Sequence, residues 1–441
     1  MAVEEAVATD RSLANSQQNK LKSEDRAVHD WYRFVLSFPP HLVGLYLNRF
    51  GADANSRVLD PFCGTGTVLV EAKKLGFASV GTEANAFAKF ASTVKTDWSV
   101  DPDRLRKHAK ERFILASEQL ERDGYPDIPL TADGRSERGT VRTLSKQAND
   151  LLLTGSISPI PLHKTLVLLD VLRSDEDAGY LSHEALALAK ALVTSVGNLH
   201  FGPEVGVGKP KPDAPVLSIW LANMEAMVED LESLAIRTNV RSDVYSGDAR
   251  EIADYMEPGT VDVVITSPPY PNEKDYTRTT RLESVILGFI EDKQQLRQLK
   301  MGLLRSNTRN VYKADDDDEW VSGHPRVQEI ATAIEKKRID LGKTSGFERL
   351  YHRVTKLYFG GMARHLFELR SVLRPGAHLA YVVGDQASYL RIMIRTGQLL
   401  AEIAESLGYE VTDIELFRTR IATATREQLR EEVVLLRWPG V

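Results

Sequence analysis

A strand, a turn of small residues and a helix follow one another in VLDPFCGTGT, residues 58–67, with the helical pattern beginning at about Val68. Two residues of the turn, Gly64 and Gly66, allow a ligand to approach backbone that a side chain would otherwise shield. In a doubly wound parallel sheet, the turn after the first strand lies at the carboxyl edge, where such sheets bind their ligands. We therefore expect an α/β fold with a ligand site at this turn.

Other short apolar segments end in turns containing Gly or Pro and precede helical patterns, which indicates a parallel sheet. The expected parallel strands are residues 57–60, 79–82, 261–266 and 377–383, the last of them after a turn at 374–376. Near the end of the chain, residues 411–417 and 432–437 predict a closing antiparallel pair. Together these segments predict one doubly wound sheet with an antiparallel C-terminal hairpin.

The spacing of the strands predicts two insertions. About 160 residues separate the second strand from the turn at Gly247, whereas a simple crossover unit needs only about 30. Residues 98–215, with helical stretches at 104–122 and 181–195, and residues 276–357 are therefore expected to be mainly helical insertions. Residues 1–25 are expected to be a flexible tail, and residues 26–97, 216–275 and 358–441 to form the core in three parts.

Composition excludes several classes of protein. The 441 residues are 42% hydrophobic and 27% charged, which is typical of a soluble globular protein. The N-terminal residues do not resemble a secretory signal and no apolar run could span a membrane, so we expect a cytosolic protein. The single cysteine, Cys63, excludes an intrachain disulfide and a thiolate cluster, and the histidine spacing predicts no metal site. The net charge of −6 means that any attraction to nucleic acid must be local.

Two carboxylates follow later strands at the same sheet edge. Glu83, in VGTEAN, can accept hydrogen bonds from both hydroxyls of a ribose. Asp248, in SGDAR, can accept a hydrogen bond from an adenine amino group. The turn at 58–67 has neither the lysine of a P-loop nor the third glycine of a dinucleotide-binding fingerprint. A nucleoside cofactor without a phosphate therefore fits these motifs best.

In this order the motifs resemble the S-adenosylmethionine-dependent methyltransferases that methylate exocyclic amino groups of nucleobases. The resemblance implies a Rossmann-like methyltransferase sheet, with S-adenosylmethionine as the cofactor and the three core segments forming the catalytic domain. It assigns FPPHL, residues 38–42, to covering the methionine end of the cofactor, and treats Cys63 as a small residue of the turn. The cofactor-binding residues that it implies are Phe38, Pro40, His41, Asp60, Phe62, Gly64, Gly66, Thr67, Glu83, Asp248 and Ala249.

A second motif, Ser267-Pro268-Pro269-Tyr270, directly follows the strand at 261–266. The two prolines fix φ near about −65° and remove two amide donors, so the local carbonyls can accept hydrogen bonds from a ligand. An exocyclic amino group is a weak nucleophile because its lone pair is delocalised into the ring. Hydrogen bonds to the Ser267 hydroxyl and the Pro268 carbonyl would redirect that lone pair, while Tyr270 stacks on the base. Methyl transfer would then be a direct displacement without a metal or a covalent intermediate.

This tetrapeptide resembles the Asp/Asn/Ser-Pro-Pro-Tyr element of the same family, in which the Ser form is associated mainly with N4 of cytosine. The resemblance therefore implies a site-specific DNA methyltransferase acting on N4 of a flipped cytosine. Three alternatives stay open: N6-adenine methylation, methylation of RNA or a protein amide, and a noncatalytic DNA-binding subunit. The intact cofactor turn and Glu83 argue against the last of these. Double-stranded DNA is the expected partner, with a cognate restriction endonuclease encoded nearby and a location at the nucleoid.

A DNA methyltransferase needs a phosphate-binding surface near the flipped base. Residues 276–313 carry eight Lys and Arg against three Asp and Glu, a surplus of +5. We expect DNA contacts from Arg278, Arg281, Arg305 and Arg309 of this segment and from Lys209 and Lys211 of the loop at 202–215. A solvated helix face explains residues 293–300 equally well, and the loop could equally be a plain connection. The family usually places its recognition domain just before the catalytic tetrapeptide, so either insertion remains a candidate for this role.

Overall fold

The computed structural model describes residue 21 and residues 25–33, 38–128, 139–175, 179–202, 204–234, 238–272, 274–421 and 428–440. The predicted N-terminal tail, residues 1–25, lies outside the described residues except at positions 21 and 25.

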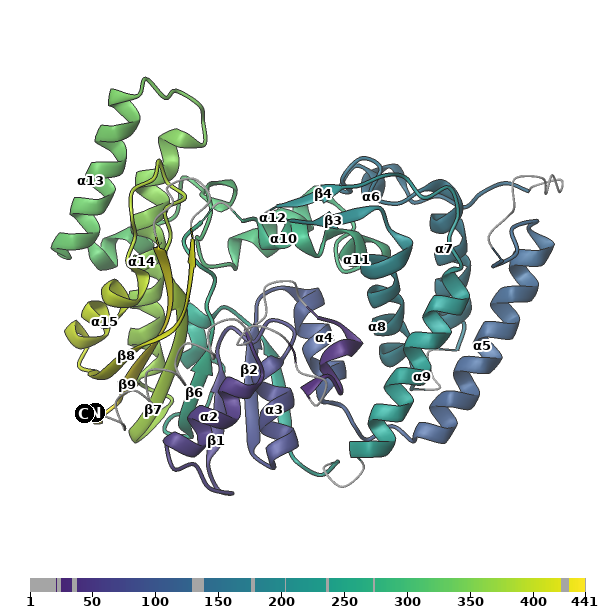
Figure 1. Ribbon diagram of the computed structural model, residues 1–441, viewed down its shortest axis with the longest axis horizontal. Helices are drawn as coiled ribbons and strands as arrows, with labels where there is room; N and C mark the ends of the chain where they lie inside the picture. The colour runs from purple at the N-terminus through teal and green to yellow at the C-terminus, as the bar shows by residue number, and fades with distance from the viewer. Residues whose placement is uncertain are drawn as a thin grey trace, which may run out of the picture.

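One seven-stranded sheet forms the centre of the protein, with the strand order β5-β2-β1-β6-β7-β9-β8 (Figure 1). Its strands are β1 (Arg57–Asp60), β2 (Ala78–Glu83), β5 (Ser242–Ser246), β6 (Val261–Thr266), β7 (Leu373–Gly384), β8 (Glu410–Ile421) and β9 (Gln428–Arg437). The first five strands pair in parallel, whereas β9 is antiparallel to both β7 and β8. The predicted α/β class, the doubly wound sheet and its antiparallel C-terminal hairpin are therefore confirmed.

The strand order reverses between β1 and β6. From β1 the chain proceeds outward to β2 and β5, and it then returns to β6 on the other side of β1. In doubly wound sheets the crevice outside the carboxyl ends at this reversal is where ligands bind. The turn after β1 and the tetrapeptide after β6 are consequently neighbours, although about 200 residues separate them in the sequence.

Helices cover both faces of the sheet because alternate strand residues point to opposite sides. Leu59 and Val264 belong to the apolar cluster on the side of α14 and α15, whereas Val58 and Val263 belong to the cluster on the side of α2 and α3. The covering helices are α2 (His41–Arg49), α3 (Thr67–Leu75), α4 (Ala86–Thr96), α14 (Tyr351–Leu369) and α15 (Thr396–Ser406). Among the helices of the described ranges, none is long and apolar enough to cross a bilayer.

Strand β7 begins earlier than predicted and contains the segment that we expected to be a preceding turn. Val261 of β6 pairs with Leu373, and Val263 pairs with His378, so residues 374–377 form an irregularity inside the strand. Gly376 has a φ of 88° there, which a glycine adopts without strain. The prediction that β7 begins at residue 377 is therefore wrong, because a bulge interrupts the strand without ending it.

The first insertion is a helical bundle that extends beyond the predicted boundary at residue 215. It comprises α5 (Pro102–Arg122), α6 (Lys146–Asn149), α7 (Pro159–Arg173), α8 (Leu181–Ala191) and α9 (Val216–Leu234), with a hairpin of β3 (Leu199–Phe201) and β4 (Val205–Val207). A π-helical turn, Leu192–Val196, extends α8. The fully buried Trp220 and Met227 of α9 pack in the apolar cluster of this bundle. Helix α9 thus belongs to the insertion, on the right of Figure 1.

The second insertion divides into two parts. Helices α10 (Tyr276–Thr279), α11 (Arg281–Ile286) and α12 (Lys293–Met301) lie beside the first insertion, where Val285 and Ile290 pack with Ala148 and Leu151. Helix α13 (Pro325–Asp340) packs against α14 at the opposite side of the molecule (Figure 1). Helix α14 starts within the segment predicted as insertion, because its apolar face covers the sheet.

Candidate active site

The two predicted motifs meet where β1 and β6 end. The Thr266 hydroxyl donates a hydrogen bond of 2.6 Å to Oδ1 of Asp60, and the backbone N–H of Phe62 donates to the same oxygen at 3.1 Å. Asp60 is only 1% exposed, and this burial raises its pKa to about 7. Asp60 therefore supports the turn from the interior, and it places the turn beside Ser267, the residue that follows Thr266.

The two glycines of the turn do different work. A Cβ built on Gly64 (φ 51°) has no atom within 4 Å, so the backbone at this position is open to a ligand. A Cβ on Gly66 (φ 83°) would lie 2.5 Å from Oγ of Ser92 in α4. Gly66 and the next residue, Thr67, are buried. Ligand contact at both glycines stays a prediction; the structure leaves open space at Gly64, whereas Gly66 permits α3 and α4 to pack closely.

The carboxylate of Glu83 faces the same turn from the end of β2. Its Oε2 accepts a hydrogen bond of 2.9 Å from the backbone N–H of Gly64, and its Oε1 accepts one of 2.7 Å from the backbone N–H of Asn85. Burial raises the pKa of Glu83. Each oxygen still has a second lone pair, so the carboxylate can hold the turn and accept hydrogen bonds from a ribose.

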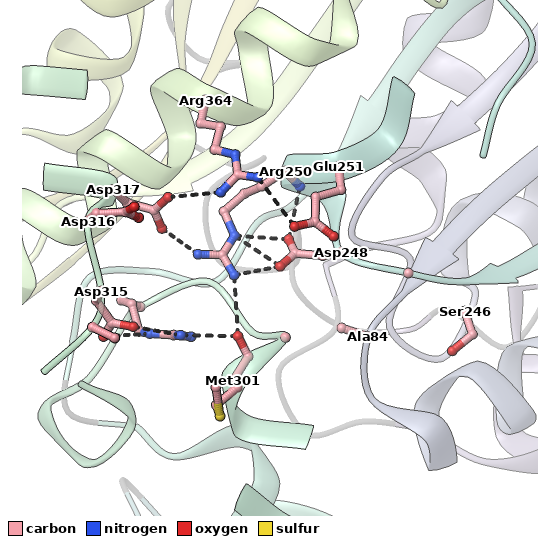
Figure 2. A pocket seen from close by; sticks show the side chains of 14 residues that line it. Ala84, Ser246, Asp248, Arg250, Glu251, Met301, Asp315, Asp316, Asp317 and Arg364 are labelled. Carbon is pink, nitrogen blue, oxygen red and sulfur yellow. Dashed lines mark hydrogen bonds and ion pairs between the residues drawn. The ribbon is translucent and has the colours of Figure 1, made fainter. Parts of the chain in front are cut away.

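A pocket of about 490 Å³ lies at the end of β5, and Asp248 forms part of its wall (Figure 2). Nε of Arg250 donates to both carboxylate oxygens of Asp248, at 3.0 and 3.1 Å, and Nη2 donates at 2.5 Å. Arg250 also pairs with Asp317, whose other oxygen lies 3.7 Å from Nη1 of Arg364. Met301 and Gly302 line the same pocket. The second insertion therefore supplies one wall of the predicted adenine site.

A buried histidine of α14 connects this pocket to the glycine turn. His365 is 0% exposed, and burial lowers its pKa to about 4, so the ring is neutral. Its Nδ1 lies 2.9 Å from the carbonyl of Ala249, and its Nε2 lies 2.7 Å from the hydroxyl of Tyr381. Because the carbonyl can only accept, Nδ1 carries the proton and Nε2 accepts from Tyr381. The His365 ring also lies edge-on to Phe62, with centroids 4.9 Å apart.

The tetrapeptide after β6 is partly accessible at its serine and tyrosine. The Ser267 hydroxyl donates a hydrogen bond of 3.1 Å to the carbonyl of Val382 in β7. Pro268 is buried, whereas Pro269 is partly exposed. The Tyr270 ring packs on Gly384 at the end of β7, since a Cβ on that glycine would lie 2.9 Å from the ring. The backbone N–H of Tyr270 donates to the hydroxyl of Tyr276 at 3.4 Å.

The predicted methionine-end element precedes α2. Phe38 is half-buried and packs with Val263 and Ile265 in the cluster under α2 and α3. Pro40 precedes α2 directly, and His41 is its first residue. These three residues therefore lie on the α2 side of β6, the strand that leads into Ser267.

Arg305 is not a surface cation, contrary to the expectation that it contacts DNA. It is 4% exposed, and all three of its guanidinium nitrogens donate within the protein. Nε and Nη2 each bond Asp315 at 2.9 Å, while Nη1 and Nη2 bond the carbonyls of Lys300, Met301 and Leu303. Its guanidinium therefore braces the end of α12.

Two more side chains that were predicted to contact DNA donate hydrogen bonds to backbone carbonyls of the protein itself. Arg281 donates to the carbonyls of Thr277, at 3.2 Å, and Leu151, at 3.3 Å. Nζ of Lys211 donates to the carbonyls of Ser195 and Gly197 at 2.6 and 2.7 Å. Burial lowers the pKa of both side chains. Lys211 holds the loop at 202–215 to the end of the π-helical turn, which favours the plain-connection interpretation of this loop, while Arg281 joins α11 to the first insertion at Leu151.

The other three predicted contacts reach solvent to different degrees. Lys209 is exposed and Arg278 is half-buried. Arg309 keeps 34% of its side chain exposed and lies 3.8 Å from Glu204 of the first insertion. Arg309 is therefore placed between the two insertions and remains available to an anion.

Four residues of the site escaped the sequence analysis: Thr266, His365, Arg250 and Lys95. Nζ of Lys95 in α4 donates to the carbonyl of Thr65 in the glycine turn at 2.8 Å. Arg250 lies two residues after Asp248, and this adjacency is a signal that could have been used. A single sequence offers no signal for His365 or Lys95, which reach the site only through the folding of distant helices.

Comparisons with known proteins agree with these motifs. A family model described as DNA methylase matches residues 10–92. The Type II methyltransferase M.BsoBI of Geobacillus stearothermophilus is 25% identical over 465 aligned positions, which cover 99% of this chain and 88% of that protein. M.AvaI of Nostoc sp. is 25% identical, with coverages of 97% and 89%. A tRNA (guanine(10)-N2)-dimethyltransferase of Methanothermobacter thermautotrophicus is 45% identical over 47 residues, 11% of this chain and 14% of that protein. Together with the motifs joined at one sheet edge, these similarities support an amino-methyltransferase family for this chain.

Proposed function

We propose that this protein methylates the exocyclic amino group of a base flipped out of double-stranded DNA, with N4 of cytosine as the target atom. The observation that carries this proposal is the position of the Ser267 hydroxyl. Its proton is donated to the carbonyl of Val382, so the lone pairs of Oγ remain to accept a hydrogen bond from an amino group. The link between Thr266 and Asp60 holds this oxygen beside the cofactor turn.

Three features of the carboxyl edge fit S-adenosylmethionine. The backbone of Gly64 is open, Glu83 presents a carboxylate at the end of β2, and Asp248 forms part of a pocket large enough for a nucleobase. Phe62 and Ala249, both held by His365, would complete the nucleoside site. S-adenosylmethionine supplies an electrophilic methyl group when it is bound.

The chain's own residues would act by positioning. Ser267 Oγ and the Pro268 carbonyl accept the two N–H bonds of the target amino group, which directs its lone pair away from the ring. Tyr270, fixed against Gly384, stacks on the base. Alignment of nitrogen and methyl carbon at roughly 3 to 3.5 Å would supply most of the acceleration. No group of this set has to remove the proton before the methyl group is transferred.

DNA is favoured over RNA as the substrate by the extent of the matches. The family description names DNA, and the two Type II methyltransferases match nearly the whole chain, insertions included. The tRNA enzyme matches only 47 residues. We infer a role in restriction and modification, with a cognate endonuclease as the functional partner. Ser267, in place of an acid or amide, favours cytosine over adenine.

Incubation of the full chain with labelled S-adenosylmethionine and an unmethylated duplex, followed by digestion to nucleosides, tests the proposal. We expect labelled N4-methylcytosine, and parallel incubations with tRNA should stay unlabelled. Labelled N6-methyladenine would show that the target base is adenine and not cytosine, and the assignment as a DNA amino-methyltransferase would stand. Label confined to tRNA, or none in any nucleoside, would refute the assignment.

A further inference from the structure

Helices α13 and α14 form a hairpin whose tip, residues 336–349, projects beyond the carboxyl edge of the sheet (Figure 1). Helix α14 runs from this tip to the start of β7, and β7 returns toward the carboxyl edge. The ring of Tyr351, the first residue of α14, lies 5.0 Å from the ring of Tyr389 in the segment that follows β7. The hairpin tip therefore lies at the carboxyl edge of the sheet, where Ser267 also lies.

Three large apolar side chains of the hairpin tip are exposed. Ile339 is 61% exposed, Leu341 is 54% exposed and Phe347 is 53% exposed, and every residue from 339 to 347 is exposed. The inner face of α13 differs from the tip, since Val327 and Ile334 are fully buried against the core. The apolar residues of the tip therefore contribute nothing to that core.

The hairpin is also locally basic. Residues 325–356 carry eight Lys and Arg against four Asp and Glu, a surplus of +4 in a chain whose net charge is −6. Lys336, Lys343 and Arg349 of the tip are exposed. Lys343 lies 3.4 Å from Glu348, which offsets part of this charge. The remaining excess favours a polyanionic partner over an acidic or neutral protein surface.

One residue predicted from the sequence to contact DNA lies at this tip. The guanidinium of Arg309 lies over the Phe347 ring, 5.9 Å from its centroid. Cationic and apolar groups are thus combined at one place on the carboxyl edge. Proteins that unstack DNA show this combination, with cations on the phosphates and an apolar wedge between or against the bases.

We propose that the hairpin tip is a DNA-contacting wedge, in which Lys336, Lys343 and Arg349 bind phosphates while Leu341 and Phe347 press into the groove beside the flipped base. This inference rests on the proposed function, because it deepens the DNA site of the same enzyme. It moves the main DNA contact of the second insertion from the segment at 276–313, where Arg305 is buried, to the hairpin between α13 and α14.

The phosphate contacts are tested by the salt dependence of DNA affinity. The variant Lys336→Ala/Lys343→Ala/Arg349→Ala should bind a duplex more weakly, with a log–log salt slope shallower by about 2 to 3, since each phosphate contact contributes about 0.9. The matched control, Arg104→Ala/Lys107→Ala/Lys110→Ala on α5, removes the same charge at the far end of the molecule (Figure 1). Equal slopes in the tip variant and the control would overturn the proposal.

The wedge is tested by its dependence on base pairing. Leu341→Ser/Phe347→Ser should lower kcat/KM by about tenfold on a fully paired duplex, because unstacking the target costs a few kcal/mol. On a duplex with an abasic site opposite the target, the loss should be much smaller. An equal loss on both substrates, with unchanged thermal stability, would refute the wedge. If the wild-type chain methylates DNA while the tip variants match it, the inference fails and the proposed function stands; absent wild-type methylation rejects the function itself.

Discussion

At the scale of single residues, substitutions of Ser267 and Asp248 should change different kinetic parameters. Ser267→Ala removes the proposed acceptor for the target amino group, so kcat should fall by about 100-fold with little change in the KM for S-adenosylmethionine. Asp248→Asn keeps the shape of the side chain but weakens acceptance from the cofactor, so that KM should rise about tenfold or more. Steady-state kinetics with each substrate varied separately measures both effects. Similar kinetic losses in the two variants would contradict these roles.

Lys95 provides a prediction about stability and pH. It is 1% exposed, and burial lowers its pKa from 10.5 to about 7. Between these values the unfolded state binds the proton and the folded state does not, so stability should rise with pH, by at most about 1.4 kcal/mol per unit. Urea unfolding from pH 7 to pH 9 should therefore show a steeper rise for the wild type than for Lys95→Met. Lys107→Met, at an exposed site of α5, should behave like the wild type, and parallel curves for all three proteins would contradict the prediction.

At the scale of elements, the sequence predicts best what depends on local pattern. The strand at 261–266 and the turns that follow β1 and β6 are encoded by short runs of apolar residues, Gly and Pro, and the structure has them as expected. Arg305 shows where local pattern stops being informative. Its sequence context suits a phosphate contact as well as it suits the buried structural role that the residue has. Its burial depends on Asp315 and three carbonyls that the folded loop brings around it. The assignment of α9 to the first insertion likewise depends on which apolar face it meets, and periodicity does not specify that partner.

The glycine turn gives a prediction at the same scale, because its two glycines are matched in conformation and differ in surroundings. Gly66→Ala should lower stability by about 2 to 3 kcal/mol, since its Cβ would meet Ser92 in addition to the strain of a positive φ. Gly64→Ala carries only the strain, about 1 to 2 kcal/mol, yet its new methyl group points to where the cofactor would lie. Urea unfolding and cofactor titration should therefore rank the two variants in opposite order. The same order in both measurements would contradict the separation of packing from ligand access.

At the scale of the whole molecule, Arg309 makes a polar contact between the two insertions, apart from the apolar packing of Val285 and Ile290 on Ala148 and Leu151. Arg309 lies 3.8 Å from Glu204 beside β4 and over the ring of Phe347 at the hairpin tip. The side chain of Arg309 is 34% exposed and that of Glu204 is 45% exposed. An ion pair this exposed contributes between 0 and about 1 kcal/mol to stability. The ion pair is therefore weak, and a phosphate can replace Glu204 as the partner of Arg309.

This exchange predicts the effect of each partner on DNA binding. Glu204→Gln removes the competing carboxylate, so duplex affinity at low salt should rise about two- to fivefold without a change in Tm. Arg309→Gln should weaken binding and make the log–log salt slope shallower by about 1, because one phosphate contact is lost. The double variant should behave like Arg309→Gln, since Glu204 acts on DNA only by occupying that guanidinium. If Glu204→Gln still tightened binding in the absence of Arg309, the effect would be a general loss of negative charge, and the two insertions would not share this contact.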